Sequence, residues 1–242
     1  MPPVGRSLPW VNPGVESPKL SIVIPMLNEA AGIEAALTLL QPLRETGVEI
    51  IVVDGGSHDN SVALATPLVD KLLTSDPGRA RQMNLGAEHA NAPTLLFLHA
   101  DTRLPEGASK LITQALEASA WGRFDIQLEG KSRWLPIVSR MMNLRSRLSG
   151  IATGDQSLFL RRESFDAVGG FPDQPLMEDI ELSKQLKMLS PPVCLRTKVV
   201  SSGRRWDQFG ACKTIYLMWR LRYRYWRGVS ATQLAKEYRN AR

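Results

Sequence analysis

The chain has 242 residues, of which 43% are hydrophobic and 22% charged, and its formal net charge is +6. This composition is typical of a globular domain and excludes a disordered tail protein or a collagen-like repeat. No apolar stretch approaches the ~18 residues that a membrane-spanning helix needs. The 2 cysteines are too few for a disulfide framework or a cysteine-rich metal site, so we expect a cytoplasmic protein.

The charge is divided unevenly along the chain. Residues 1–120 contain 8 basic and 13 acidic residues, whereas residues 121–242 contain 22 basic and 11 acidic ones. The first half therefore carries −5 and the second half +11, which indicates different roles for the two halves. The basic half is suited to bind phosphates, a membrane surface or nucleic acid.

The first half alternates short apolar, β-branched runs with helical periodicity. Residues 1–19, rich in Pro and Gly, lack the features of a signal peptide, and we expect them to form a flexible leader. Strands are predicted over residues 21–25, 49–53, 71–74 and 94–98, and helices over residues 29–45, 61–69, 78–91 and 106–118. This alternation predicts an α/β fold with a mainly parallel sheet that is flanked by helices on both faces.

The second half adds a predicted helix at residues 178–189, a strand at 193–201 and a basic, aromatic C-terminal helix at 214–229. The last of these places arginines on one face and Ile, Met and Trp residues on another. Three roles are open for it: a lid over the site, an interface such as that of a homodimer, or a helix lying peripherally on a membrane. Residues 134–148 have a similar mixture of arginines with aromatic and apolar residues, and we expect them to line an acceptor site.

Polar side chains follow several of the predicted strands, where the ligands of parallel sheets bind. They are Asn28 and Glu29, then Asp54, then residues 99–102. The chain contains neither G-x-G-x-x-G nor G-x-x-x-x-G-K-[ST], which disfavours dinucleotide and P-loop chemistry. Carboxylates can face a nucleotide phosphate only with a divalent cation between them, so we expect Mg²⁺ or Mn²⁺.

Three segments together resemble the inverting family 2 glycosyltransferases, which have the GT-A fold. They are SIVIPMLNE at residues 21–29, VVDGGSHD at 52–59 and LHADT at 98–102. Further along, GDQ at 154–156, GGF at 169–171 and the acidic pair at 178–179 fit the acceptor half of that family. Three features are most similar to the arsenosugar and selenosugar branch: His-Ala-Asp for the usual Asp-x-Asp, Gly-Asp-Gln, and SGRRW at 202–206.

The resemblance implies a GT-A domain at residues 20–206, with a nucleotide-binding half at 20–120, an acceptor half at 121–206, and C-terminal helices at 207–242. The implied reaction moves a hexose or N-acetylhexosamine from a UDP-sugar to a small anionic acceptor, with selenophosphate expected. An alternative is a membrane-associated enzyme with a lipid, polyprenyl or carotenoid acceptor. A non-catalytic RNA- or membrane-binding protein is the alternative of another class, although no RNA-binding motif occurs and no nucleic-acid partner is expected.

The resemblance also implies roles for the matching residues. Asp179 would be the general base, and Glu178 would orient the acceptor or contact the sugar. Contacts to the nucleotide sugar are expected from Pro25, Asn28, Glu29, Asp54, Gly55, Ser57, Arg79, Gln82, Asp101, Arg204 and Arg205. Asp155, Gln156 and Glu178 are expected at the acceptor or sugar, and the metal ion at Asp101 with His99 as a second ligand.

Several of these residues have a structural alternative. Asp54 is also typical of a turn or helix cap, and Glu29 of a first helical turn. His99 could bond a sugar hydroxyl or a phosphate, or stand at a strand end without contacting ligand. Asp179, close to a helix N-terminus, is expected to be held ionised by the helix dipole. Arg204 and Arg205 are expected on a loop, where adjacent arginines can clamp a diphosphate.

Overall fold

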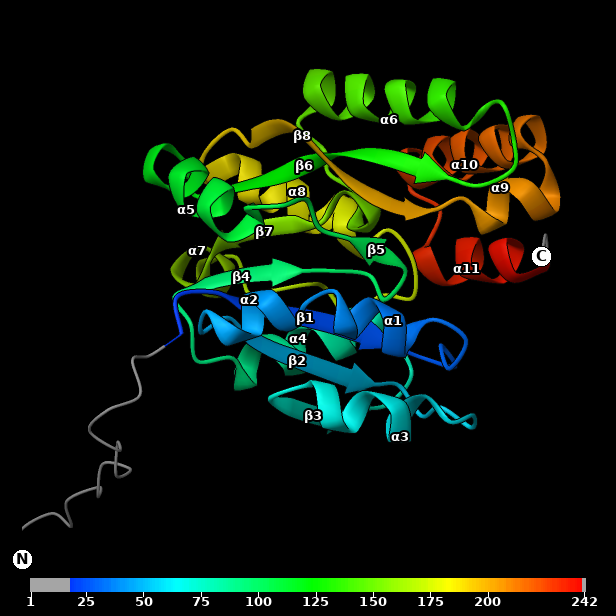
Figure 1. Ribbon diagram of the computed structural model, residues 1–242. Coiled ribbons are helices and arrows are strands. Elements are labelled where there is room, and N and C mark those ends of the chain that lie inside the picture. The colour runs from blue at the N-terminus through cyan, green and yellow to red at the C-terminus, as the bar shows by residue number, and fades with distance from the viewer. Residues whose placement is uncertain (1–17, 241–242) are drawn as a thin grey trace, which may run out of the picture.

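The computed structural model describes residues 18–240, so most of the predicted leader lies outside the described residues. Figure 1 shows one sheet between layers of helices. Its strands are β1 (Ser21–Met26), β2 (Glu49–Asp54), β3 (Lys71–Thr74), β4 (Thr94–Phe97), β5 (Thr102–Arg103), β6 (Trp121–Glu129), β7 (Leu158–Arg161) and β8 (Val193–Ser202). They lie in the order β3-β2-β1-β4-β7-β6-β8-β5.

The sheet is mixed and mainly parallel, which confirms the predicted fold class. Strands β3, β2, β1 and β4 pair in parallel, as do β6 and β8. Strand β7 runs antiparallel to both β4 and β6, and the short β5 runs antiparallel to β8. The acidic first half of the chain thus forms one side of the sheet, and the basic second half supplies most of the other.

The helices cover both faces of this sheet. They are α1 (Ile33–Thr38), α2 (Gln41–Glu45), α3 (Ser61–Ala65), α4 (Arg79–His89), α5 (Ala108–Ala118), α6 (Leu135–Ser149), α7 (Arg162–Ala167), α8 (Glu178–Leu189), α9 (Arg204–Phe209), α10 (Ala211–Trp226) and α11 (Ala231–Asn240). Two short 3-10 helices, η1 (Thr66–Leu68) and η2 (Gly154–Gln156), complete the set described here. None of the helices within residues 18–240 is long and apolar enough to cross a bilayer.

Two predicted helices and one predicted loop differ from the structure. The helix expected over 29–45 is divided into α1 and α2, because Pro42 stands in the first turn of α2 and has no N–H to continue the preceding helix. The helix expected over 61–69 stops at Ala65 and continues as the 3-10 turn that contains Pro67. Arg204 and Arg205 open α9 instead of lying on a loop, because that helix begins just after β8.

The core consists of apolar layers on the two faces of the sheet. Alternate residues of β1 show this directly, since Ile22 and Ile24 belong to one buried cluster and Val23 to the other. Helix α4 packs close to the second layer at Gly86, where a Cβ would lie 2.3 Å from Val23 Cγ1. Glycine at this position therefore allows α4 to approach the sheet and fixes the position of the α4 N-terminus.

The C-terminal helices gather at the end of the sheet toward which β1, β2 and β8 point (Figure 1). A third buried cluster joins Met177 and Ile180, at the start of α8, to Leu221 of α10 and Leu234 of α11. This packing holds α10 and α11 beside the ends of the parallel strands, where the predicted site lies.

Candidate active site

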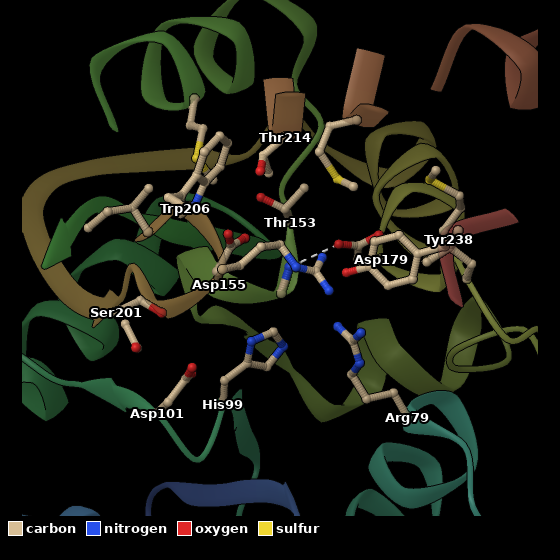
Figure 2. A pocket seen from close by; sticks show the side chains of 18 of the residues that line it. Arg79, His99, Asp101, Thr153, Asp155, Asp179, Ser201, Trp206, Thr214 and Tyr238 are labelled. Carbon is tan, nitrogen blue, oxygen red and sulfur yellow. Dashed lines mark hydrogen bonds between the residues drawn. The ribbon is translucent and has the colours of Figure 1, made fainter. Parts of the chain in front are cut away.

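A cleft of about 1520 Å³ lies at the carboxyl ends of the strands and is bounded by α6, α8, α9 and α10. Figure 2 shows Arg79, His99 and Asp101 on one side of it, with Asp155 and Asp179 facing them. Of the predicted residues, it is lined by Pro25, Glu29, Arg79, Gln82, His99, Asp101, Asp155, Glu178, Asp179, Arg204 and Arg205. The structure therefore brings most of the predicted donor and acceptor residues into one space.

Asp179 is half-buried in the first turn of α8 and faces this cleft. The preceding Met177 has a left-handed backbone with φ 66°, a conformation that a non-glycine residue adopts at a cost. Asp179 Oδ2 accepts a hydrogen bond from the Gly154 backbone N–H at 3.0 Å. The local fold thus aims this carboxyl at η2 and the space beside it.

The pKa of Asp179 is raised to about 7, firstly because burial disfavours the ionised form and secondly because Glu178 is a like charge. Gly154 and Arg79 oppose the shift without cancelling it. The expectation that the helix dipole would hold this carboxyl firmly ionised is therefore wrong. A carboxyl with a pKa near neutrality is well matched to take a proton at physiological pH.

Arg79, at the start of α4, connects the two sides of the cleft. Its Nε lies 3.7 Å from Glu178 Oε1. Burial lowers the pKa of His99 to about 4, and the positive charge of Arg79 adds to this effect. His99 is accordingly a neutral imidazole at physiological pH.

The Nε2 atom of His99 is buried and has no hydrogen-bond partner among the described residues. A Cβ added to Gly154 would lie 2.4 Å from this nitrogen, so the ring packs against the Gly154 backbone. His99 borders the cleft, and its predicted ligation of the metal ion stays a prediction.

Asp101 and Glu29 share one arginine at the rim of the cleft. Arg204 Nη2 lies 3.3 Å from Glu29 Oε2 and 3.4 Å from Asp101 Oδ2. No group of three His, Cys, Asp or Glu side chains suited to hold a metal ion occurs within residues 18–240. A cation at Asp101 would therefore need ligands from a bound nucleotide, and a single rim carboxylate fits that arrangement.

Asp54, a predicted contact to the nucleotide sugar, is the last residue of β2 and does not line the cleft. Its carboxylate accepts hydrogen bonds from Gly56 N at 3.0 Å, from Ser57 N and from Ser57 Oγ. Ser57 Oγ also accepts from Asn28 N at 2.8 Å. These hydrogen bonds brace the loops after β1 and β2, and the nucleotide contacts predicted for Asn28, Asp54 and Ser57 stay predictions.

Two further predicted residues have structural partners. Gln82 donates from Nε2 to the carbonyl oxygens of Met26 and Val53, both at 2.8 Å, and thereby ties β1 to β2. Gly55 is pressed against this amide, since a Cβ there would meet it at 3.0 Å. Gln156 is fully buried and caps η2 through Thr153, so its position does not favour the predicted contact with sugar or acceptor.

Arg205 borders the cleft and stacks over the Tyr238 ring of α11, with its guanidinium carbon 4.2 Å from the ring centroid. The contact is a cation–π interaction. Through this contact, α11 helps to orient Arg205, a residue that is predicted to bind a diphosphate.

One cleft residue was not singled out in the sequence, although it lies within residues 134–148, which were expected to line an acceptor site. Arg145, on α6, lines the cleft, and its buried Nη2 has no hydrogen-bond partner among the described residues. Burial lowers the pKa of this guanidinium, whereas the charges of Asp155 and Asp179 raise it. The helical stripe of Val138, Met141, Met142 and Leu148 was the available signal, since it predicts that one face of this helix also carries Arg145.

Comparison with known families decides which class of protein has this site. The sequence model of "Glycosyl transferase family 2" matches residues 21–169. The chain belongs to glycosyl transferase family 2. This makes the protein a nucleotide-sugar glycosyltransferase, and the matched part ends before Asp179 and the C-terminal helices.

Individual similarities agree with this family and are distant. An uncharacterised protein of Mycobacterium tuberculosis is 28% identical over 222 residues, covering 80% of this chain and 69% of the relative. The mannosyltransferase PcManGT from Pyrobaculum calidifontis, solved with GDP-Man and Mn²⁺, superposes with a TM-score of 0.60 at 20% identity, covering 86% of this chain and 61% of that chain. The chain thus spans less than two thirds of this neighbour.

A second structural neighbour is glucosyl-3-phosphoglycerate synthase from Mycobacterium tuberculosis, solved with Mn²⁺, UDP and glucosyl-3-phosphoglycerate. Its TM-score is 0.55 at 20% identity, with coverage of 79% of this chain and 77% of that chain. These likenesses show a GT-A-like α/β fold. Both neighbours were solved with Mn²⁺.

Proposed function

We propose that the protein transfers a hexose or N-acetylhexosamine from a UDP-sugar to a small anionic acceptor, with inversion at the anomeric carbon. The carrying observation is that Asp179, with a pKa of about 7, lies in the same cleft as Asp101 and Arg204. A UDP donor is supported by the likeness to a synthase solved with UDP. Selenophosphate is the proposed acceptor, and the product is a selenosugar.

In this reaction the acceptor atom attacks the anomeric carbon while the bond from that carbon to the diphosphate oxygen breaks. UDP leaves with the bonding electrons. Selenophosphate already presents an anionic nucleophile, so that the C–Se bond forms without removal of a proton by the protein. A hydroxyl acceptor would instead pass its proton to the Asp179 carboxylate, while Glu178 orients the acceptor.

Mg²⁺ or Mn²⁺ fits the donor side of the cleft through Asp101, because carboxylate oxygen is a ligand that both ions accept. Arg204 already places a positive charge against this carboxylate. The ion, when bound, would neutralise charge on the leaving diphosphate. Arg204 and Arg205 would contact phosphate oxygens through charge-assisted hydrogen bonds.

Arg145 supports an anionic acceptor substrate. Its buried guanidinium has an unpaired Nη2, which requires an oxygen atom to accept its hydrogen bond. A second candidate is a lipid-linked or polyprenyl acceptor, used at the inner face of a membrane. The observation that favours it is the apolar wall of the cleft, formed by Met141, Leu144, Leu148, Met218 and Trp219. Both candidates are glycosyl transfers, and they differ in the acceptor.

An acceptor screen tests the proposal. Purified protein with Mn²⁺ is given UDP-glucose or UDP-N-acetylglucosamine together with selenophosphate or a polyprenyl phosphate, and products are identified by mass spectrometry. Release of UDP with a new C–Se product supports the first candidate, and a lipid-linked sugar supports the second. No UDP release with any donor, acceptor or divalent ion would overturn the proposed UDP-dependent activity.

Asp101→Ala is the matching variant, and Asp76→Ala, an exposed aspartate outside the cleft lining, is its control. Loss of one charge-stabilising group typically lowers turnover by ~10²–10³-fold. We expect this loss for Asp101→Ala and near-normal turnover for Asp76→Ala. Full metal-dependent activity in Asp101→Ala would remove Asp101 from the metal site.

A further inference from the structure

Helices α6 and α10 each expose a stripe of apolar side chains to solvent. The α6 stripe consists of Trp134, Ile137, Met141, Leu144 and Leu148, and the α10 stripe of Tyr216, Trp219, Tyr223 and Trp226. The exposed fraction is 41–80% on α6 and 58–77% on α10. Spacings of three and four residues place each set on one helical face, where a soluble helix normally carries polar residues.

The two stripes border the mouth of the active-site cleft. Met141, Leu144 and Leu148 of the first stripe and Trp219 of the second also line the cleft. Each of these four side chains is therefore shared between the cleft wall and the exposed surface. Both stripes therefore reach the cleft through these four side chains.

The segments that carry these stripes are basic and contain no acidic residue, although acids of other elements, Asp125 and Glu237, pair with three of their arginines. Residues 131–150 and 210–229 contain 10 of the 30 Lys and Arg residues of the chain and no Asp or Glu. Arg140 on α6 and Lys213 and Arg227 beside the aromatic stripe are exposed. Glu237 of α11 pairs with Arg220 and Arg224, which offsets only part of this charge.

We propose that the α6 and α10 stripes dock the protein on the surface of an anionic phospholipid bilayer, with the mouth of the cleft facing the lipid. Trp and Tyr beside Arg and Lys are the side chains that suit a membrane–water interface, because their rings enter the headgroup layer while cations contact lipid phosphates. Each basic residue near such a surface adds to binding.

The charge argues against a second copy of the chain as the occupant. Self-association through this face would bring two acid-free basic segments together, and like charges oppose such contact. An anionic bilayer supplies both an apolar layer and the opposite charge. The docking goes beyond the transfer reaction, since it states where the cleft opens and not which sugar or acceptor reacts.

Vesicle sedimentation tests the docking with the full chain. The probes are vesicles of phosphatidylcholine alone and of phosphatidylcholine mixed with phosphatidylglycerol. The variant is Ile137→Ser combined with Trp226→Ser, because these two stripe residues do not line the cleft. The control is Met188→Ser on α8, which is 86% exposed and belongs to neither stripe.

The wild-type protein and Met188→Ser should sediment with the anionic vesicles, more weakly with phosphatidylcholine alone, and less as salt is raised. The double variant should lose ~10-fold or more of this partitioning, as expected when two large apolar side chains leave the interface. UDP release from the donor without vesicles should equal that of wild type, which separates failure of docking from failure of the proposed transfer.

Either of two results would overturn the docking. One is equal vesicle binding by the wild type and the double variant, and the other is wild-type protein that stays in solution with both kinds of vesicle. If light scattering then shows a dimer that the double variant loses, the stripes belong to an interface between two copies instead of to a membrane.

Discussion

The raised pKa of Asp179 has two measurable consequences. As a general base it acts only when ionised, so transfer to a hydroxyl acceptor should increase with pH through about 7 and then level off. Asp179→Asn should lower that rate by ~10²–10⁴-fold. With selenophosphate the loss should be smaller, because no proton is removed. Initial rates with both acceptors across this pH range measure the difference, and equal losses would argue against the anionic acceptor.

The same shift predicts a stability effect of definite sign. The folded-state pKa of Asp179 lies above the ordinary value of 3.8 for an aspartate, so the folded protein prefers the protonated carboxyl. Its contribution to stability is fully present below about pH 4 and is lost as pH rises to about 7. Asp179→Asn should therefore raise the melting temperature at pH 8, by ~2–4 °C for each ~1 kcal/mol recovered. A gain only at acidic pH would contradict this sign.

Arg145 is predicted to bind the acceptor and not the donor. Arg145→Met keeps the length of the side chain and removes its charge, and Arg140→Met makes the same change at an exposed position of α6 outside the cleft. A charge-assisted hydrogen bond is worth ~1.5–3 kcal/mol, so Arg145→Met should raise the acceptor KM by ~10–100-fold. The donor KM should stay the same. Similar behaviour of the two variants would assign Arg145 a purely structural role.

At the scale of elements, the position of α4 depends on its packing against β1 at Gly86. Gly86→Ala would place a methyl group 2.3 Å from Val23 Cγ1, whereas a Cβ at Gly32 has no neighbour within 4 Å. Overpacking of this kind costs ~1–3 kcal/mol. We expect Gly86→Ala to lower the melting temperature, and Gly32→Ala to leave it nearly unchanged. Because α4 begins with Arg79, the first variant should also raise the donor KM.

Sequence patterns predicted the first four strands well, because their apolar, β-branched runs are local signals. They did not predict β6, which pairs in parallel with β8. Strands β1, β2, β3 and β4 lie within a residue of their predicted positions, and α8 matches its predicted range. The antiparallel partners β5 and β7 had no such signal. Strand β5 has only two residues. It pairs with β8, with Thr102 opposite Ser201, and these two segments are far apart in the chain.

The candidate site was predictable to the extent that strand ends determine it. Asp101 and Glu29 follow buried strands, and the sheet brings them to one edge. Arg145 was predictable only in part: the apolar positions at helical spacing place it, and not Arg140, on one face of α6, but only tertiary packing shows that this face lines the cleft. A turn was one of the alternatives for Asp54, but its hydrogen-bond partners depend on the geometry of the loop and could not be predicted from the sequence.

At the scale of the whole molecule, the opposite charges of the two halves meet at the donor side of the cleft. Glu29 and Asp101 come from the acidic half, and Arg204, which contacts both, comes from the basic half. A divalent cation at Asp101 must share this carboxylate with Arg204 or displace it. In the proposed mechanism, the guanidinium and the cation would compete for Asp101 until a bound diphosphate supplied negative charge for both.

This competition predicts two effects of opposite sign for Arg204→Gln. Without nucleotide, Mn²⁺ should bind about 2–5-fold more tightly, since an exposed ion pair is worth ~0.2–1 kcal/mol. The KM for the UDP-sugar should rise by ~10-fold or more, because the diphosphate loses a charge-assisted hydrogen bond. Calorimetric titration with Mn²⁺ and steady-state kinetics measure the two effects. Arg196→Gln, at an exposed position of β8 outside the cleft, makes the same charge change and should alter neither. Weaker Mn²⁺ binding by Arg204→Gln would show that Arg204 supports the cation site instead of competing for it.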